Sequence, residues 1–139
     1  MIYWNANGLR GKTSVLKTVL RDQQIDVALV CETLLRPTTN LTVAGYHVYR
    51  QDEISPQGQA YRGLVVLVKR GVVHQRVPAV QLSALSALGV ELCVAGNPTR
   101  LYAAYKPPQL RFQPGDIHTL LESNIPTAVA GDFNYKHTA

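Results

Sequence analysis

Apolar positions along the chain fall into short runs separated by turn residues, with two amphipathic stretches set between these runs. Short apolar runs bounded by Gly, Pro or Asn are typical of β-strands, whereas apolar residues at helical spacing are typical of α-helices. We therefore expect an α+β fold. Strands are predicted at residues 2–6, 26–31, 45–50, 64–69, 85–95, 100–106 and 127–130.

The two amphipathic stretches predict one helix from Thr13 onward and a second, shorter helix after Pro114. Pro and Gly within residues 52–58 indicate an exposed loop, and the Gly-Asn-Pro sequence at residues 96–98 indicates the turn of a hairpin. The apolar faces of the two helices comprise Val15, Leu16, Val19 and Leu20 in the first, and Ile117, Leu120 and Leu121 in the second.

Composition places these elements in one globular domain or in part of a larger one. The 139 residues are 46% hydrophobic and only 17% charged, which argues against wholesale disorder. Fourteen Lys and Arg against nine Asp and Glu give a net charge of +5, which favours a polyanionic partner without choosing among DNA, RNA and an anionic membrane.

The two cysteines, Cys31 and Cys93, lie in apolar runs without a Cys or His at zinc-binding spacing. We expect both to be buried and reduced, which argues against a disulfide framework and a zinc site. The sequence also lacks a signal-peptide pattern and an apolar segment of membrane-spanning length, so an intracellular setting is expected.

Polar residues gather where the predicted strands end. Strand ends delivered to one edge of a sheet can hold such side chains together rigidly. The sequence therefore predicts a single site built from several strands. The residues concerned are Asn5 and Asn7 at the end of the first strand, Glu32 at the end of the second, Tyr105 near the end of the sixth, and Asp132 with Asn134 after the last.

Carboxylate and carboxamide oxygens without a Cys or His cluster suit a hard cation, Mg²⁺ or Mn²⁺. Glu32 is the best ligand candidate. Asp132 is expected to orient or deprotonate an attacking water. Asn5 and Asn134 are expected to form hydrogen bonds around a phosphoryl group, each worth about 3 kcal/mol in the transition state. Phosphodiester hydrolysis is the natural reaction for such a set.

Four motifs occur in order along the chain: WNANGL at residues 4–9, CET at 31–33, YKPP at 105–108 and GDFNYKH at 131–137. Together they resemble the endonuclease/exonuclease/phosphatase superfamily. In particular, they resemble the apurinic-like endonuclease domain of non-LTR retrotransposons of the jockey-like kind. The resemblance extends over the chain from end to end.

The resemblance implies a four-layered α/β/β/α sandwich of the DNase I-like type. It further implies an Mg²⁺- or Mn²⁺-dependent endonuclease that cuts one DNA strand and leaves a 3′-hydroxyl, which primes reverse transcription in the mobile elements. The implied partners are target DNA and, through a downstream reverse transcriptase, the element's RNA. The implied location is the nucleus, and no membrane partner is expected.

By motif position, Glu32 resembles the metal-binding glutamate, and Asn5 the asparagine beside the phosphate and the metal. Tyr105 resembles the tyrosine beside the scissile phosphate. Asp132 and Asn134 resemble the pair that positions the nucleophilic water and stabilises the transition state. We expect a DNA-binding face that comprises Arg10, Arg62, Lys106, Lys136 and His137, although solvated side chains are the usual explanation of such residues.

Three departures from the family pattern qualify these expectations. The resemblance implies Asn7 as a second metal ligand, although related abasic-site repair enzymes carry an aspartate at this position. Pro108 stands where those enzymes carry an asparagine, which disfavours a repair function. Family members also continue beyond the GDFN motif to a late Ser-Asp-His motif. We therefore expect residues 1–139 to be the N-terminal part of a single domain, incomplete at its C-terminus, that binds metal and DNA poorly and cleaves little.

Two other functions remain open at this point. The chain could be a phosphohydrolase of the same superfamily that acts on another phosphoester, such as a lipid or inositol phosphate, because the site chemistry is indifferent to what lies beyond the phosphate. It could also be a truncated, inactive transposon remnant or a binding module. Each site residue also has a structural reading: Glu32 as a solvated turn residue, Asp132 with Asn134 as an Asx turn, and Tyr105 as a strand aromatic.

Overall fold

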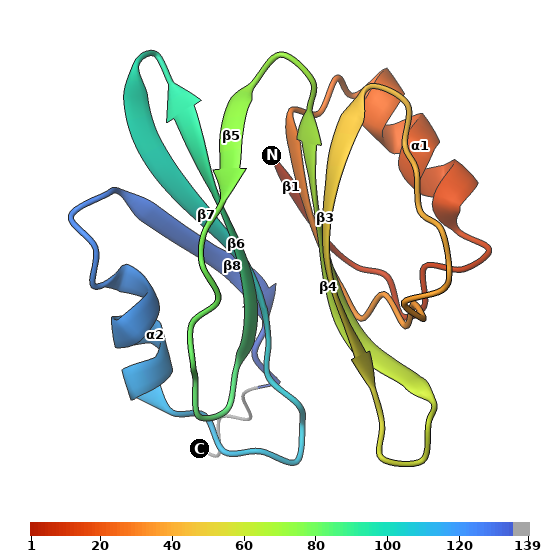
Figure 1. Ribbon diagram of the computed structural model, residues 1–139, viewed down its shortest axis with the longest axis vertical. Helices are drawn as coiled ribbons and strands as arrows, with labels where there is room; N and C mark the ends of the chain where they lie inside the picture. Colours follow the sequence, from red (N-terminus) through yellow and green to blue (C-terminus); the bar gives the residue numbers. More distant parts are fainter. Residues whose placement is uncertain (135–139) are drawn as a thin grey trace, which may run out of the picture.

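Two four-stranded sheets face one another in the computed structural model, which describes residues 1–134, and one helix covers the outer face of each sheet (Figure 1). The layers follow the order α1, first sheet, second sheet, α2. The predicted α+β class and four-layered sandwich are confirmed.

Both sheets are mixed, because one parallel pair lies at the edge of each: β1 with β2, and β7 with β8. The remaining neighbours are antiparallel. In spatial order, the first sheet comprises β1 (Ile2–Asn5), β2 (Val27–Cys31), β4 (Ala60–Lys69) and β3 (Tyr46–Ile54). The second comprises β5 (Val73–Arg76), β6 (Ser86–Val94), β7 (Asn97–Tyr105) and β8 (Thr127–Asp132). The helices are α1 (Thr13–Asp22) and α2 (Pro114–Leu121).

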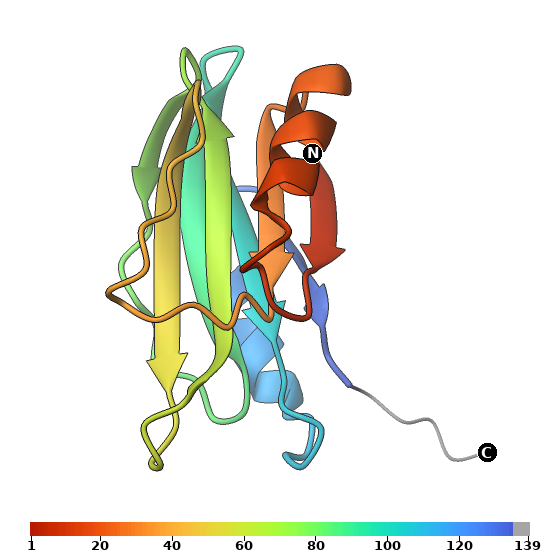
Figure 2. The ribbon, with the colours of Figure 1, turned by 90° about the vertical axis from the view of Figure 1, so that its right-hand side faces the viewer.

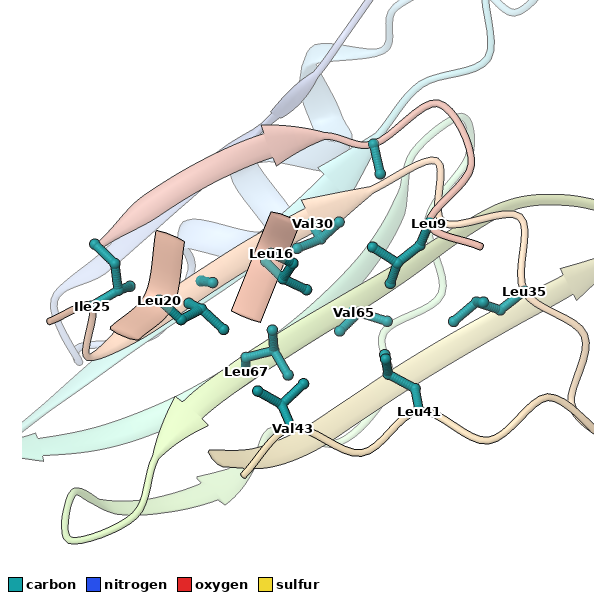
Figure 3. Close-up of a cluster of buried hydrophobic side chains, with 12 residues drawn as sticks. Leu9, Leu16, Leu20, Ile25, Val30, Leu35, Leu41, Val43, Val65 and Leu67 are labelled. Carbon is teal, nitrogen blue, oxygen red and sulfur yellow. The ribbon is translucent and has the colours of Figure 1, made fainter. Parts of the chain in front are cut away.

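Apolar side chains fill the space between every pair of layers. Strand β2 is buried at all five positions because the second sheet covers one of its faces and α1 the other. Figure 3 shows Leu16 and Leu20 of α1 packed over Val30, Val65 and Leu67 of the first sheet. On the far side, Leu120 of α2 packs against Tyr102 of β7 in a smaller cluster. This burial fixes the strand ends that carry the polar residues.

Strands β1 and β8 are the terminal strands of their sheets, and they lie on the same side of the sandwich. Figure 2 shows the two strands next to each other, with their C-terminal ends pointing the same way. The apolar surface beside β1 is partly exposed: the exposed fraction is 56% for Val15 of α1 and 38% for Tyr3. Within residues 1–134, neither helix is long and apolar enough to span a membrane.

The prediction of a loop at residues 52–58 is wrong for its first three residues, which belong to a strand. Strand β3 runs to Ile54 and pairs with β4 beyond a register shift, so Asp52 and Glu53 are half-buried strand residues. Each has a partner: Asp52 forms an ion pair with Arg50 at 2.9 Å, and Glu53 accepts a hydrogen bond from the Ser86 hydroxyl at 2.7 Å. These contacts offset the cost of placing carboxylates in a strand.

Three further expectations differ from the structure. The strand β5 was not predicted, because its sequence Val-His-Gln-Arg is mostly polar. The hairpin between β6 and β7 turns at Ala95 and Gly96, both at positive φ as a two-residue type I′ turn requires, and Pro98 lies within β7. Cys31 is buried as expected, but Cys93 is exposed, because it alternates along β6 with the buried Leu92.

Candidate active site

The proposed site residues lie at the C-terminal ends of four strands along one edge of the sandwich. Asn5 ends β1, Glu32 directly follows β2, Tyr105 ends β7 and Asp132 ends β8. The parallel registers pair Asn5 with Cys31 and Tyr105 with Asp132, so the strand ends of each sheet stand level. The two sheets then bring the ends of both pairs together.

Two side-chain hydrogen bonds join the sheets at this edge. The Asn5 amide nitrogen Nδ2 donates to Asp132 Oδ2 at 3.2 Å, although the two residues are 127 positions apart in the sequence. The Tyr105 hydroxyl donates to Glu32 Oε1 at 2.8 Å. Two carboxylates, an amide and a phenol from four strands therefore form one polar cluster between the sheets.

The backbone at the cluster adopts left-handed conformations. Glu32 has φ of 53°, which is unusual for a residue with a long side chain, and Asn7 and Asn134 have φ of 45° and 42°. Such strain concentrates at functional sites, where the surrounding structure holds it in place. At Glu32, the carbonyl accepts a hydrogen bond from the Gly8 N–H at 2.8 Å.

Both carboxylate oxygens of Asp132 accept hydrogen bonds. Oδ2 accepts from Asn5, and Oδ1 accepts from the backbone N–H of Asn134 at 3.0 Å. The Asn134 side-chain nitrogen donates in turn to the carbonyl of Lys106 at 2.6 Å. An Asx turn is therefore present, as the structural reading of these residues supposed, and the same turn fixes the orientation of the carboxylate.

Asn7 contributes its backbone to this edge: its N–H donates to Asn5 Oδ1 at 3.0 Å. The residue itself is exposed. Asn7 therefore stabilises the orientation of the Asn5 amide. A role for its side chain as a metal ligand stays a prediction.

Sequence reasoning missed Tyr3 and Cys31 as residues next to the site. The Tyr3 hydroxyl lies 2.9 Å from Cys31 Sγ, so the polar end of an otherwise partly exposed side chain turns inward. Alternation along β1 could have revealed Tyr3, because residues two apart share a face of a strand and Tyr3 therefore points the same way as Asn5. No comparable sequence signal marks Cys31, which resembles any core cysteine.

Burial raises the pKa of both these groups. Desolvation, followed by the contact with Cys31, raises the pKa of the Tyr3 phenol, and desolvation raises the pKa of the Cys31 thiol. Desolvation and the hydrogen bond to Glu32 raise the pKa of Tyr105 to about 12. The negative charges of Glu32 and Asp132 add to the increase for all three groups, so the three remain neutral hydrogen-bonding groups at physiological pH.

The predicted DNA-binding residues are placed in different ways. Arg10 is exposed in the turn after β1, and Arg62 lies over the Tyr61 ring and contacts Glu53 at 3.4 Å. Lys106 is only 2% exposed, and its ammonium group donates to two backbone carbonyls, so a direct contact with DNA does not fit its placement. The predicted residues Lys136 and His137 lie outside the described residues.

The donor set fits a hard divalent cation. Mg²⁺ is usually held through one or two carboxylates and retains several waters, so Glu32 and Asp132 with the Asn5 amide oxygen suffice. Residues 1–134 contain no group of three or more His, Cys, Asp or Glu side chains arranged to hold a metal ion.

The chain is similar to known proteins of mobile elements. The chain is 28% identical over 135 residues to the RNA-directed DNA polymerase from the mobile element jockey of Drosophila melanogaster, covering 96% of this chain and 14% of that protein. Among solved structures, the endonuclease domain of TRAS1, a telomere-specific non-LTR retrotransposon, superposes with a TM-score of 0.71 at 15% identity. That match covers 98% of this chain and 59% of the solved chain.

A second similar structure is TDP2 of D. rerio complexed with a single-strand DNA product, with a TM-score of 0.65 at 15% identity over 98% of this chain and 61% of the solved chain. At such identities, the solved structures establish the shared fold alone. The chain spans about a seventh of the length of the jockey protein and about three-fifths of the TRAS1 domain. Residues 2–139 match the family model described as Endonuclease/Exonuclease/phosphatase family, and the chain therefore belongs to this family.

Proposed function

We propose that this chain carries the phosphodiester-cleaving site of a divalent-metal-dependent endonuclease that nicks DNA. The observation that carries the proposal is the pair of hydrogen bonds between the sheets, Asn5 to Asp132 and Tyr105 to Glu32. These bonds gather two carboxylates, an amide and a phenol at one edge. The net charge of +5 favours an anionic substrate.

Glu32, with Asp132 and Asn5 close by, would hold Mg²⁺ or Mn²⁺. A bound divalent cation polarises the phosphoryl oxygens and neutralises charge that develops during attack. Asp132 is fixed through both oxygens, and carboxylate oxygens have further lone pairs, so it can accept a proton from water or orient it. Holding the nucleophile in a defined direction supplies much of the rate in phosphoryl transfer.

Asn5, Asn134 and Tyr105 supply hydrogen-bond donors near the reacting phosphate. Because the pKa of Tyr105 is about 12, its hydroxyl stays protonated. Its single proton is donated to Glu32, so donation to a phosphate oxygen would require the hydroxyl to turn away from Glu32. The Asn134 and Asn5 amides are already oriented by their contacts with Lys106 and Asp132. Donors oriented in advance stabilise developing negative charge at little reorganisation cost.

The biological context is part of the proposal. Similarity to jockey and TRAS1 supports a role in a non-LTR retrotransposon. We further propose that the 3′-hydroxyl left by the nick serves as a primer for reverse transcription. Target DNA is then the substrate, and the element's RNA would be engaged through a reverse transcriptase elsewhere in the same protein. This task takes place in the nucleus.

The test is nicking of supercoiled plasmid with Mg²⁺, with Mn²⁺ and with EDTA, for a protein that contains this chain and spans the whole family domain, and for its Glu32→Gln variant. The chain by itself is expected to cleave little. Glu32→Gln keeps the size of the side chain but removes its charge, and loss of one such contact costs about 100-fold or more in rate. Glu122→Gln is the matched control, because Glu122 lies exposed at the end of α2. Calorimetric titration with Mn²⁺ should show binding to the wild type and a large loss in Glu32→Gln.

Three outcomes would contradict the proposal or direct it to another function. Nicking that persists in EDTA, or that is equal in Glu32→Gln and wild type, would rule out this site. Faster hydrolysis of inositol or lipid phosphates than of DNA would identify a different phosphohydrolase. Binding of Mn²⁺ and DNA without any nicking would identify a binding module.

A further inference from the structure

Lys106 is a buried cation between β7 and the turn that follows it. Its side chain is enclosed, with 2% of the residue exposed. The ammonium nitrogen donates to the carbonyl of Pro107 at 2.9 Å and to that of Leu110 at 2.5 Å. Within residues 1–134, no carboxylate lies within ion-pair distance of it. In this described part of the chain, two carbonyl dipoles are the groups that compensate the charge.

These contacts close the turn at residues 107–110. The Leu110 N–H donates to the Pro107 carbonyl at 3.2 Å, so this carbonyl accepts from both the turn backbone and the ammonium group. A buried charge is unfavourable unless its donors are satisfied. A methionine of similar length would fill the same space without that cost. Packing alone therefore does not account for a charged group at this position.

The backbone of Lys106 contacts the candidate site directly. Its N–H donates to the Asp132 carbonyl at 2.8 Å, and its carbonyl accepts from Asn134 Nδ2 at 2.6 Å. A second contact links the same two segments: the Phe112 and Phe133 rings meet edge to face, with centroids 6.2 Å apart. The segment after β7 is therefore attached to the end of β8 at Asp132 and at the two residues that follow it.

We propose that Lys106 is a positioning residue of the phosphodiesterase site, which rests on the function proposed above. Its ammonium group locks the turn at residues 107–110, and the locked turn keeps the Lys106 carbonyl directed at the Asn134 amide. Asn134 in turn holds Asp132 through its backbone N–H at 3.0 Å. Lys106 acts through these residues and does not touch the substrate.

The test compares Lys106→Met, Lys106→Arg and Lys69→Met in the full chain. Lys69 is the control because it lies exposed at the end of β4. The first readout is solvent exchange of the Asn134 side-chain amide protons by NMR, which requires neither metal nor DNA. We expect exchange about tenfold faster in Lys106→Met, an intermediate rate in Lys106→Arg and no change in Lys69→Met.

The second readout is nicking at saturating DNA, together with the salt dependence of DNA binding. In Lys106→Met, kcat should fall about tenfold or more, because a small displacement of a catalytic group lowers the rate strongly. The DNA Kd and its slope against salt should stay unchanged, because a buried residue makes no phosphate contact. Lys106→Arg should restore part of the lost rate.

Unchanged Asn134 exchange in a folded Lys106→Met variant would overturn the proposal. A salt slope reduced by about one charge would also overturn it, because that loss marks a lysine that binds a phosphate. If Lys106→Met does not fold, Lys106→Gln, which also removes the charge, decides: wild-type exchange and kcat in that variant would contradict the proposal. Since amide exchange is independent of cleavage, absence of nicking in the wild type would count against the proposed function alone.

Discussion

Replacing Gly131 by alanine should separate β7 from β8 and disturb the candidate site. A Cβ on Gly131 would lie 1.8 Å from the carbonyl oxygen of Ala104 and 2.6 Å from its carbonyl carbon. Non-bonded contacts normally need about 3.5 Å, so β8 must move by roughly 1.5 Å. The obstructing atoms belong to the backbone of a buried strand, which cannot turn aside as a flexible side chain can.

The expected loss of stability has two parts. Overpacking typically costs about 1–3 kcal/mol, and weakening one ladder hydrogen bond between the strands adds about 1 kcal/mol. The sum of about 2–4 kcal/mol is a large share of the roughly 5–15 kcal/mol that stabilises an ordinary domain. Because Asp132 follows Gly131 directly, the same movement should lower the nicking rate by about 100-fold.

Urea unfolding followed by the fluorescence of Trp4, the single tryptophan, measures the first effect, and plasmid nicking measures the second. Gly115→Ala is the matched control, because nothing lies within 4 Å of a Cβ at that position in α2. Alanine should stabilise this helix by up to about 0.5–1 kcal/mol. A Gly131→Ala variant within about 0.5 kcal/mol of the wild type, with a nicking rate close to that of the wild type, would refute the steric argument.

Two more substitutions test a buried carboxylate and the site phenol. Asp116 accepts three backbone N–H groups from residues 83–85, so Asp116→Asn should lower the free energy of unfolding at pH 7 by about 2–4 kcal/mol. Burial alone would raise the pKa of Asp116, but these donors lower it below the ordinary carboxyl value. The Asp116 carboxylate therefore stabilises the fold fully above the ordinary carboxyl pKa, and this stabilisation is lost as pH falls through the lowered pKa of the folded state. Urea unfolding from pH 7 to 3 should show this loss in the wild type and not in Asp116→Asn. Tyr105→Phe removes the hydrogen-bond donor to Glu32 and should slow nicking about tenfold or more. The free energy of unfolding should change by about 1 kcal/mol. The control is Tyr102→Phe, which lies beneath α2 and should leave nicking unchanged.

Hydrophobic periodicity by itself determined most of the elements. The spacing of Leu16 and Leu20 on α1 and the apolar run of β2 depend on local side-chain geometry, so their faces could be assigned without coordinates. The same local logic failed at β5, whose residues are mostly polar. There, pairing with β6 outweighs the weak apolar signal.

The residue types of the site could also be predicted from the sequence, because a change from apolar to polar positions indicates where a strand ends. The tertiary structure decided which of these side chains lie close together. Asn5 and Asp132 are 127 positions apart, and only the parallel pairs at the two sheet edges bring them within 3.2 Å. No periodicity carries information over such a separation.

Lys106 marks the limit of sequence reasoning most clearly. A lysine at the end of a predicted strand suggested a surface contact with DNA, because lysine side chains are exposed in most environments. The structure buries it, because the turn at residues 107–110 provides two carbonyls that satisfy its ammonium group. The sequence determined which groups were present, and the packing of two sheets and one turn decided which of them act on the same site.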